Sequence, residues 1–214
     1  MDVYNTEEEQ VEAIKKWWNE NGKSIIAGII IGVIAIFGWR SYENHTAMQA
    51  KAASILYEQL LVASRKNDTN NIRSIANNIL ADYESSTYAI FSKLMLAKLE
   101  SESGDLENAE VHLYSILDNV SRDEFKHITR VRLIRVLIAN NKLESAEELL
   151  TKVKPNQFAA HYEELRGDIF AKQGNVKGAV KAYQKAIANS TSNEDAQIIL
   201  QMKLKKILKV YIKI

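Results

Sequence analysis

The chain has 214 residues, with one Pro, eight Gly and no Cys, and its formal net charge is +1. That length suits one compact domain with accessory segments, and so little Pro and Gly favours helices over sandwiches, barrels and disordered linkers. The missing Cys excludes a disulfide scaffold, a thiolate metal site and a Cys nucleophile. The nearly neutral charge gives no reason to expect nucleic acid as a partner.

Residues 1–23 are predicted to form a short amphipathic tail. Thr6 followed by Glu9 fits a capping box, which predicts a helix that begins near Glu7. Such a helix would lie at a membrane surface, and a docking helix for a partner is the alternative. The apolar residues that recur on one face at helical spacing are Val11, Ile14, Trp17 and Trp18.

Residues 24–40 are predicted to form a transmembrane helix. From Ser24 to Trp39 the sequence reads SIIAGIIIGVIAIFGW, with no charged residue, and Lys23 and Arg40 bracket it. A helix of this length extends about 24 Å, so the flanking cations and aromatic side chains must extend the span into the interfaces of a layer roughly 30 Å thick. A buried core helix is the alternative, but a core helix usually carries a polar stripe.

The residues in and around the span predict whether it is cleaved, how it is oriented and whether another helix packs on it. The preceding segment is long and acidic and no Ala-x-Ala site follows, which indicates an uncleaved anchor. Three Lys precede the span, which favours a cytoplasmic N-terminus. Gly28, Gly32 and Ala35 form a small-residue face against which another helix can pack, although Gly is common in membrane helices in any case.

Residues 41–214 alternate helix-period apolar segments with short polar breaks, which predicts about nine helices in antiparallel pairs and no strand. One pattern recurs three times around the turn residues Gly104, Asn141 and Gly174, which are 37 and 33 residues apart. Gly and Asn tolerate the left-handed conformation that ends a helix. After each turn come a small residue and then a bulky one: Ala109, Ala146 and Ala179, then Leu113, Leu150 and Tyr183.

The two ends of this domain are less regular. A looser first copy is expected over Ala50–Leu80, with its turn near Asn67, and Asn193–Ile214 are expected to form a C-terminal capping helix. The predicted fold is therefore all-α: one N-terminal transmembrane helix, then an α-solenoid of antiparallel helix pairs with a terminal cap. The residues that make the last helix amphipathic are Ile198, Ile199, Met202, Leu204, Leu208 and Tyr211. Its Lys residues indicate a solvated face, or alternatively contact with anionic lipid or a partner: Lys203, Lys205, Lys206 and Lys209.

The spacing of the three copies resembles the tetratricopeptide repeat, and LRGDIFAKQGNVKGAVKAYQKAI matches it best. The match departs from that pattern at Glu163 and Arg166, where bulky apolar residues are usual, and it lacks the closing Pro. The whole layout, with EQVEAIKKWWNENGK before the span, GWR at its exit and QMKL in the last helix, resembles the YfgM-type ancillary subunits of the bacterial Sec translocon.

That resemblance implies a protein of the bacterial inner membrane with a cytoplasmic tail and a periplasmic tetratricopeptide-repeat-like domain. The implied partners are the SecYEG channel, a membrane-anchored periplasmic chaperone of the prolyl-isomerase type, and translocating client chains. The implied role is to pass newly translocated chains to periplasmic chaperones. No catalytic residue and no cofactor come with the family.

The sequence carries no enzyme motif. P-loop, GxGxxG and GxSxG patterns are missing, and the four His are not spaced as metal ligands. Neighbouring carboxylates, Glu147 with Glu148 and Glu163 with Glu164, indicate solvated helix faces rather than acid–base pairs. Two hypotheses compete with the translocon subunit: a membrane-anchored repeat adaptor in envelope signalling or complex assembly, and an enzyme whose site carries no known motif.

A binding groove is the most plausible site. In tetratricopeptide stacks the first helix of each pair lines the concave surface, and its apolar content predicts a groove that accepts an extended or helical segment of a partner or client. The alternative is that these residues pack against neighbouring helices. The predicted groove residues are Tyr57, Leu61, Phe91, Leu94, Lys98, Ile128, Val131, Arg135, Ile138, His161, Glu164 and Asp168.

Overall fold

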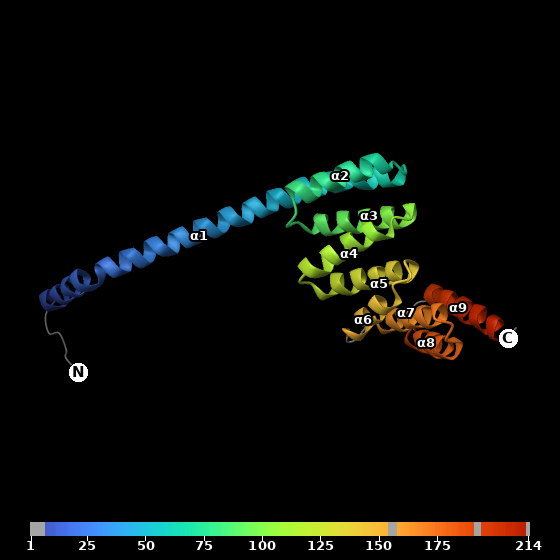
Figure 1. The fold of residues 1–214 in the computed structure, drawn as a ribbon. Helices are drawn as coiled ribbons and strands as arrows, with labels where there is room; N and C mark the ends of the chain where they lie inside the picture. Colours follow the sequence, from blue (N-terminus) through green and yellow to red (C-terminus); the bar gives the residue numbers. More distant parts are fainter. Residues whose placement is uncertain (1–6, 154–157, 191–193, 213–214) are drawn as a thin grey trace, which may run out of the picture. The chain divides into compact units, whose positions relative to one another are not determined.

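The computed structural model describes residues 7–153, 158–190 and 194–212, and this part of the chain contains helices but no strand. This confirms the predicted all-α fold. The chain divides into two compact units, Met1–Ala52 and Ala53–Ile214. In chain order the helices are α1 (Glu7–Arg65), α2 (Thr69–Asp82), α3 (Thr87–Ser103), α4 (Leu106–Asn119), α5 (Asp123–Ala139), α6 (Leu143–Thr151), α7 (Ala159–Lys172), α8 (Val176–Asn189) and α9 (Glu194–Ile212) (Figure 1).

The N-terminal unit is helical from Glu7 onward, where the capping pattern predicted a helix to begin, while Thr6 itself lies outside the described residues. Residues 24–40 are helical, and every side chain in that range except Ile25 is exposed. Within the described residues, one helix is long and apolar enough to cross a membrane, and it contains this range. A core helix would bury such side chains, so their exposure argues against the core alternative.

The turns of the C-terminal unit follow the predicted pattern. Their residues have positive φ: 55° at Asn67, 86° at Gly104, 60° at Asn141 and 76° at Gly174. In each turn the N–H of the next residue donates to a carbonyl five residues earlier, as from Asn175 N to Phe170 O at 2.8 Å. That bond satisfies a carbonyl at the helix end and requires the left-handed turn residue.

The residue after the turn then starts the next helix. Asp68, Asp105 and Asn175 each accept a hydrogen bond from the backbone N–H three residues on, which caps α2, α4 and α8. Lys142 occupies that position before α6, where no side chain makes the cap. One short motif therefore both ends a helix and begins its antiparallel partner.

The small and bulky positions pack as expected, with the three Ala residues fully buried. In the first copy, Ile72 stands at the Ala position and Ala76 stands at the bulky position, and both are buried. Exchanging large and small residues keeps the packed volume while hiding the pattern, which explains why this copy is looser in sequence. In the last copy, Gly167 of α7 lies against Tyr183, and a Cβ added at Gly167 would be 2.5 Å from Tyr183 Cε1.

Helix α9 packs on α8 as the predicted cap. Leu200, Leu204 and Ile207 join the cluster formed by Ala179 and Tyr183. The apolar pattern of the last helix was only partly right about which residues face the stack, because four of them are exposed: Ile198, Ile199, Met202 and Leu208.

Helices of the C-terminal unit pack mainly on their neighbours in the chain, from α2 against α3 through to α8 against α9, with α5 also packed on α7 (Figure 1). The largest core cluster runs from α3 to α7 and contains the fully buried Leu133 and Ile134. A second cluster joins Leu60 and Ala63 of α1 to α2 and α3. The domain is thus a series of linked small cores rather than one central core.

Candidate functional site

An open groove lies within the C-terminal unit, formed by Tyr57 of α1 together with α3, α4 and α5. Its volume is about 640 Å³ and most of its lining is apolar. A hollow of this size and character can take up apolar side chains of another molecule. The lining residues are Tyr57, Phe91, Leu94, Met95, Ala97, Lys98, Ser101, Leu106, Leu113, Phe125, Ile128, Arg132, Arg135, Val136 and Ala139.

Aromatic rings from three helices meet at one part of the groove. The ring centroid of Phe91 lies 5.6 Å from Tyr57, 6.3 Å from Tyr88 and 5.7 Å from Phe125. The guanidinium of Arg122 lies 5.0 Å from the centre of the Phe125 ring. These separations are those of favourable aromatic and cation–π pairs. Burial raises the pKa of Tyr57, so its hydroxyl stays protonated at neutral pH.

The structure brings together some of the predicted groove residues. Val131 and Ile138 are only 7% and 8% exposed and pack in the core, and neither of them lines this groove. Leu61 is half-buried and does not line the groove. The predicted residues that line it are Tyr57, Phe91, Leu94, Lys98, Ile128 and Arg135.

On α5 the predicted face is displaced around the helix. The groove side of α5 includes Phe125, Ile128, Arg132, Val136 and Ala139. Those positions follow the three- and four-residue spacing of a single helix face. Ile128, Arg132 and Ala139 on this face are exposed, whereas Val136 is buried. The sequence does not single out this face, because α5 buries apolar side chains on more than one side.

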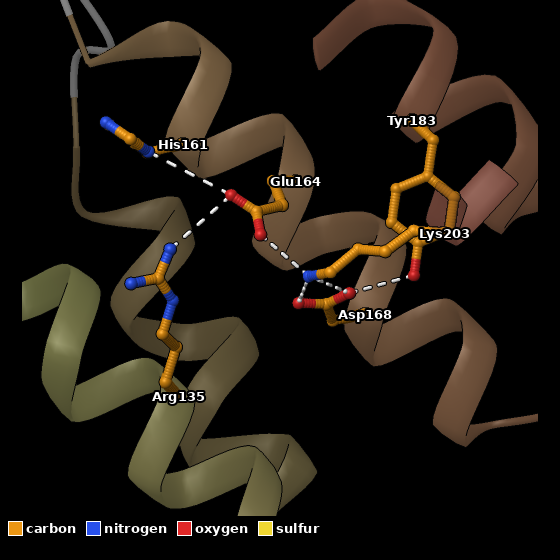
Figure 2. Close-up of polar contacts among 6 residues, drawn as sticks. All are labelled: Arg135, His161, Glu164, Asp168, Tyr183 and Lys203. Atoms are coloured by element: carbon orange, nitrogen blue, oxygen red, sulfur yellow. Dashed lines mark hydrogen bonds and ion pairs between the residues drawn. The ribbon is translucent and has the colours of Figure 1, made fainter. Parts of the chain in front are cut away.

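Apart from the groove, a network of polar side chains joins α7 to α8 and α9 (Figure 2). Lys203 Nζ donates to Glu164 Oε1 at 2.7 Å and to the two Asp168 oxygens at 2.8 and 2.7 Å. The Tyr183 hydroxyl donates to Asp168 Oδ1 at 2.8 Å. Burial and then the negative charge of Asp168 raise the pKa of Tyr183, which keeps this donor protonated.

Glu164 also faces α5 and its own helix. Arg135 Nη2 lies 3.4 Å from Glu164 Oε2, and His161 Nδ1 lies 3.9 Å from the same oxygen (Figure 2). Burial by itself raises the pKa of Glu164, but the neighbouring His161, Lys203 and Arg135 outweigh burial and lower that pKa to about 2. Glu164 is therefore ionised throughout the neutral range and forms an ion pair with the groove residue Arg135.

This network corrects several predictions. His161, Glu164 and Asp168 were predicted to line the groove, but they do not line it, and the two carboxylates bind Lys203. Glu163 and Glu164 were predicted as solvated neighbours, whereas the Glu164 side chain is 12% exposed. Lys203 was predicted on a solvated face, or in contact with lipid or a partner, whereas its ammonium binds two carboxylates of α7 and its side chain is 31% exposed. Among the described residues no three His, Asp or Glu side chains could hold a metal ion.

Gly28, Gly32 and Ala35 of the small-residue face lie on α1, and all three are exposed. A Cβ added at Gly28 or Gly32 would meet no atom within 4 Å. The chain itself therefore leaves this face open to close approach.

Comparison with known proteins gives relatives for the whole chain. The family model for the tetratricopeptide repeat-like domain matches residues 15–209. Proteins named ancillary SecYEG translocon subunit match nearly end to end. That of Escherichia coli (strain K12) is 29% identical over 204 residues, 95% of this chain and 98% of the relative. That of Haemophilus influenzae is 32% identical over 203 residues, 94% of this chain and 98% of the relative.

More distant relatives extend the same set. The ancillary SecYEG translocon subunit of Neisseria gonorrhoeae is 27% identical over 205 residues, 95% of this chain and 98% of the relative. No solved structure matches the chain. Because the family model covers most of the chain and relatives at 32% identity are matched over 98% of their length, the chain belongs to the family of ancillary SecYEG translocon subunits, built on a tetratricopeptide repeat-like domain.

Proposed function

We propose that this protein is a membrane-anchored, non-catalytic adaptor of the SecYEG translocon whose groove binds a polypeptide segment of a partner. The observation that carries the proposal is the groove itself, an apolar hollow of about 640 Å³ built on helices that are fixed by their own cores. Exposed apolar surface of this kind favours insertion of side chains from another chain. The names of the relatives supply the translocon as the place of action.

The groove's partner in this proposal is a membrane-anchored periplasmic chaperone of the prolyl-isomerase type or a newly translocated client chain. Binding either one would let the protein pass chains from the channel to periplasmic chaperones. The support for a protein ligand is the mixture of aromatic rings and aliphatic side chains, which suits the varied side chains of a polypeptide.

The proposed topology follows the sequence regions: residues 1–23 in the cytoplasm, residues 24–40 across the inner membrane, and residues 41–214 in the periplasm. The exposed apolar side chains of the middle region support a span, since lipid would cover them. Gly28, Gly32 and Ala35 then offer a face for a helix of the channel or of the anchored chaperone, because backbones can approach closely there.

Topology is tested with single cysteines in a chain that has none of its own. The exposed positions Glu12 and Lys181 are replaced by Cys in separate variants and treated with a membrane-impermeant thiol reagent. We expect labelling of Lys181→Cys in cells with a permeable outer membrane, and labelling of Glu12→Cys only after the inner membrane is lysed. The reverse order of labelling would contradict the proposed orientation.

Groove binding is tested by photo-crosslinking in native membranes. A photoreactive residue at Ile128, on the groove, is compared with one at Val111, which is 62% exposed on α4 and does not line the groove. We expect adducts with a SecYEG subunit, a periplasmic chaperone or a secreted client from position 128 and far fewer from position 111. Adducts only with envelope signalling proteins would favour the signalling adaptor instead.

Single substitutions separate binding from packing. Ile128→Glu should abolish partner capture while leaving the melting temperature close to that of wild type, and Val111→Glu is the matched control. Phe91→Glu should also abolish capture but should lower the melting temperature, because the Phe91 ring packs on three other rings. If Ile128→Glu instead lowers the melting temperature strongly, and Val111→Glu does not, the side chain of Ile128 serves packing rather than partner binding.

A further inference from the structure

The groove carries positive charge and no negative charge. Lys98, Arg132 and Arg135 line it, and among the described residues no Asp or Glu does. Lys98 lies 3.7 Å from Glu102, and Arg135 lies 3.4 Å from Glu164, so both have a carboxylate outside the groove. A surface with one sign of charge attracts the opposite charge in a ligand.

Arg132 differs from the other two cations. It makes no hydrogen bond or ion pair with any described residue. Partial burial, followed by the positive charge of Arg135, lowers the pKa of Arg132. The residue is nevertheless exposed, so its guanidinium is accessible to a ligand. An incoming carboxylate would supply the missing partner and could bind the guanidinium through two parallel hydrogen bonds.

Arg132 lies on the same helix face as Phe125, so helix geometry sets its distance from the aromatic rings of the groove. Arg132 follows Ile128 by one turn and Phe125 by two turns on the groove side of α5, which corresponds to about 6 and 10 Å along the helix axis. Phe125 is itself packed on Phe91 at 5.7 Å. The groove thus has an aromatic section and, about one to two turns away, a cationic section.

We infer that the groove selects acidic–apolar segments: stretches of polypeptide in which a bulky apolar side chain enters the aromatic section and a carboxylate nearby in sequence binds Arg132. In an extended ligand the two groups would be about two to three residues apart, and in a helical ligand about one to two turns apart. This inference rests on the proposed function, because it names the chemistry of the segment that the groove binds.

The test uses three synthetic fluorescent peptides with the repeated pattern Phe-Leu-X-X, where X is Glu, Gln or Lys throughout. Their affinities for the full chain in neutral detergent are measured by fluorescence anisotropy. The proteins are wild type, Arg132→Gln, and Lys177→Gln, a matched loss of one exposed positive charge on α8. Melting temperatures show whether each variant folds. Arg132→Gln should fold like wild type, because replacing Arg132 removes no ion pair among the described residues.

We expect wild type to prefer the Glu peptide over the Gln peptide by about two- to fivefold, the range expected for an exposed ion pair, and to bind the Lys peptide weakest. Arg132→Gln should lose that preference while keeping its affinity for the Gln peptide, and Lys177→Gln should keep the preference. Added salt should reduce the preference in wild type.

Three results would overturn the inference. Equal binding of the Glu and Gln peptides would show that the groove does not select charge. The proposed function would stand in that case, because the groove would still bind apolar segments. An unchanged Glu preference in Arg132→Gln would place the selecting charge elsewhere. Concentration-dependent self-association that Ile128→Glu abolishes, seen by sedimentation, would assign the groove to a second copy of the chain. The proposed function itself fails separately, if no peptide binds and position 128 yields no adduct in membranes.

Discussion

Replacing Glu164 with Gln tests whether the network on α7 stabilises the end of the domain. Gln has nearly the shape of the protonated acid, so the variant reproduces the acid form at every pH. Lys203 and Arg135 would then face a neutral amide in a setting where the Glu164 side chain is only 12% exposed. We expect α9 to be held less firmly and the domain to unfold more easily at neutral pH.

The size of the effect follows from the pKa. The pKa of Glu164 falls from 4.5 to about 2 on folding, and that difference corresponds to about 3 kcal/mol of folding free energy. Because the folded pKa is the lower one, this contribution is complete above about pH 5 and is lost as the pH falls through 2. About 1 kcal/mol of it should be gone by pH 3.5.

The assay is urea unfolding of the full chain in neutral detergent, followed by circular dichroism, because all three Trp lie in the first 40 residues and do not report on the repeats. The gap in unfolding free energy between wild type and Glu164→Gln should be about 3 kcal/mol at pH 7 and about 2 kcal/mol at pH 3.5. Glu102→Gln, an exposed carboxylate, should match wild type at both values. If the difference in unfolding free energy between wild type and Glu164→Gln is near zero at pH 7, or does not become smaller at pH 3.5, the ionised Glu164 does not stabilise the domain.

Substitutions at three further positions probe packing and turns, each measured by thermal unfolding. Gly167→Ala should lower the melting temperature, because overpacking against Tyr183 costs about 1–3 kcal/mol and outweighs a helix gain of about 1 kcal/mol; an unchanged or higher value would show that the ring moves freely. Leu133→Ala, at a fully buried site, should cost about 2–5 kcal/mol, and a loss below about 1 kcal/mol would mean that the core collapses around the gap. Asn141→Ala should cost about 1 kcal/mol at φ 60°, whereas Asn141→Gly should stay near wild type, and equal melting of the two would contradict strain at that turn.

The turns were the most predictable part of the fold because their chemistry is local. Gly104, Asn141 and Gly174 have left-handed conformations that few residues adopt without strain, so residue type alone indicates where a helix ends. The small residue that follows each turn is set by close approach within one helix pair. Both signals are contained in fewer than about twenty neighbouring residues, and both therefore survive in a single sequence.

The site was less predictable because its determinants are not local. Helix α5 buries Val131, Leu133 and Val136 on different sides, so its apolar pattern does not single out the groove face. The polar network joins residues far apart in the chain, such as Lys203 and Glu164, 39 residues apart. A lysine in a basic stretch and a glutamate beside another glutamate both look solvated until the packing of α9 on α7 and α8 is known.

Because helices of the repeat unit pack mainly on their neighbours in the chain, the order of synthesis can also be the order of assembly. The cluster that joins α1, α2 and α3 contains no residue of α8 or α9, so it can form before those helices have emerged. Short-range contacts of this kind favour rapid folding. The domain can therefore fold progressively, one hairpin after another, and Lys203 can bind Glu164 and Asp168 only after α9 has been synthesised.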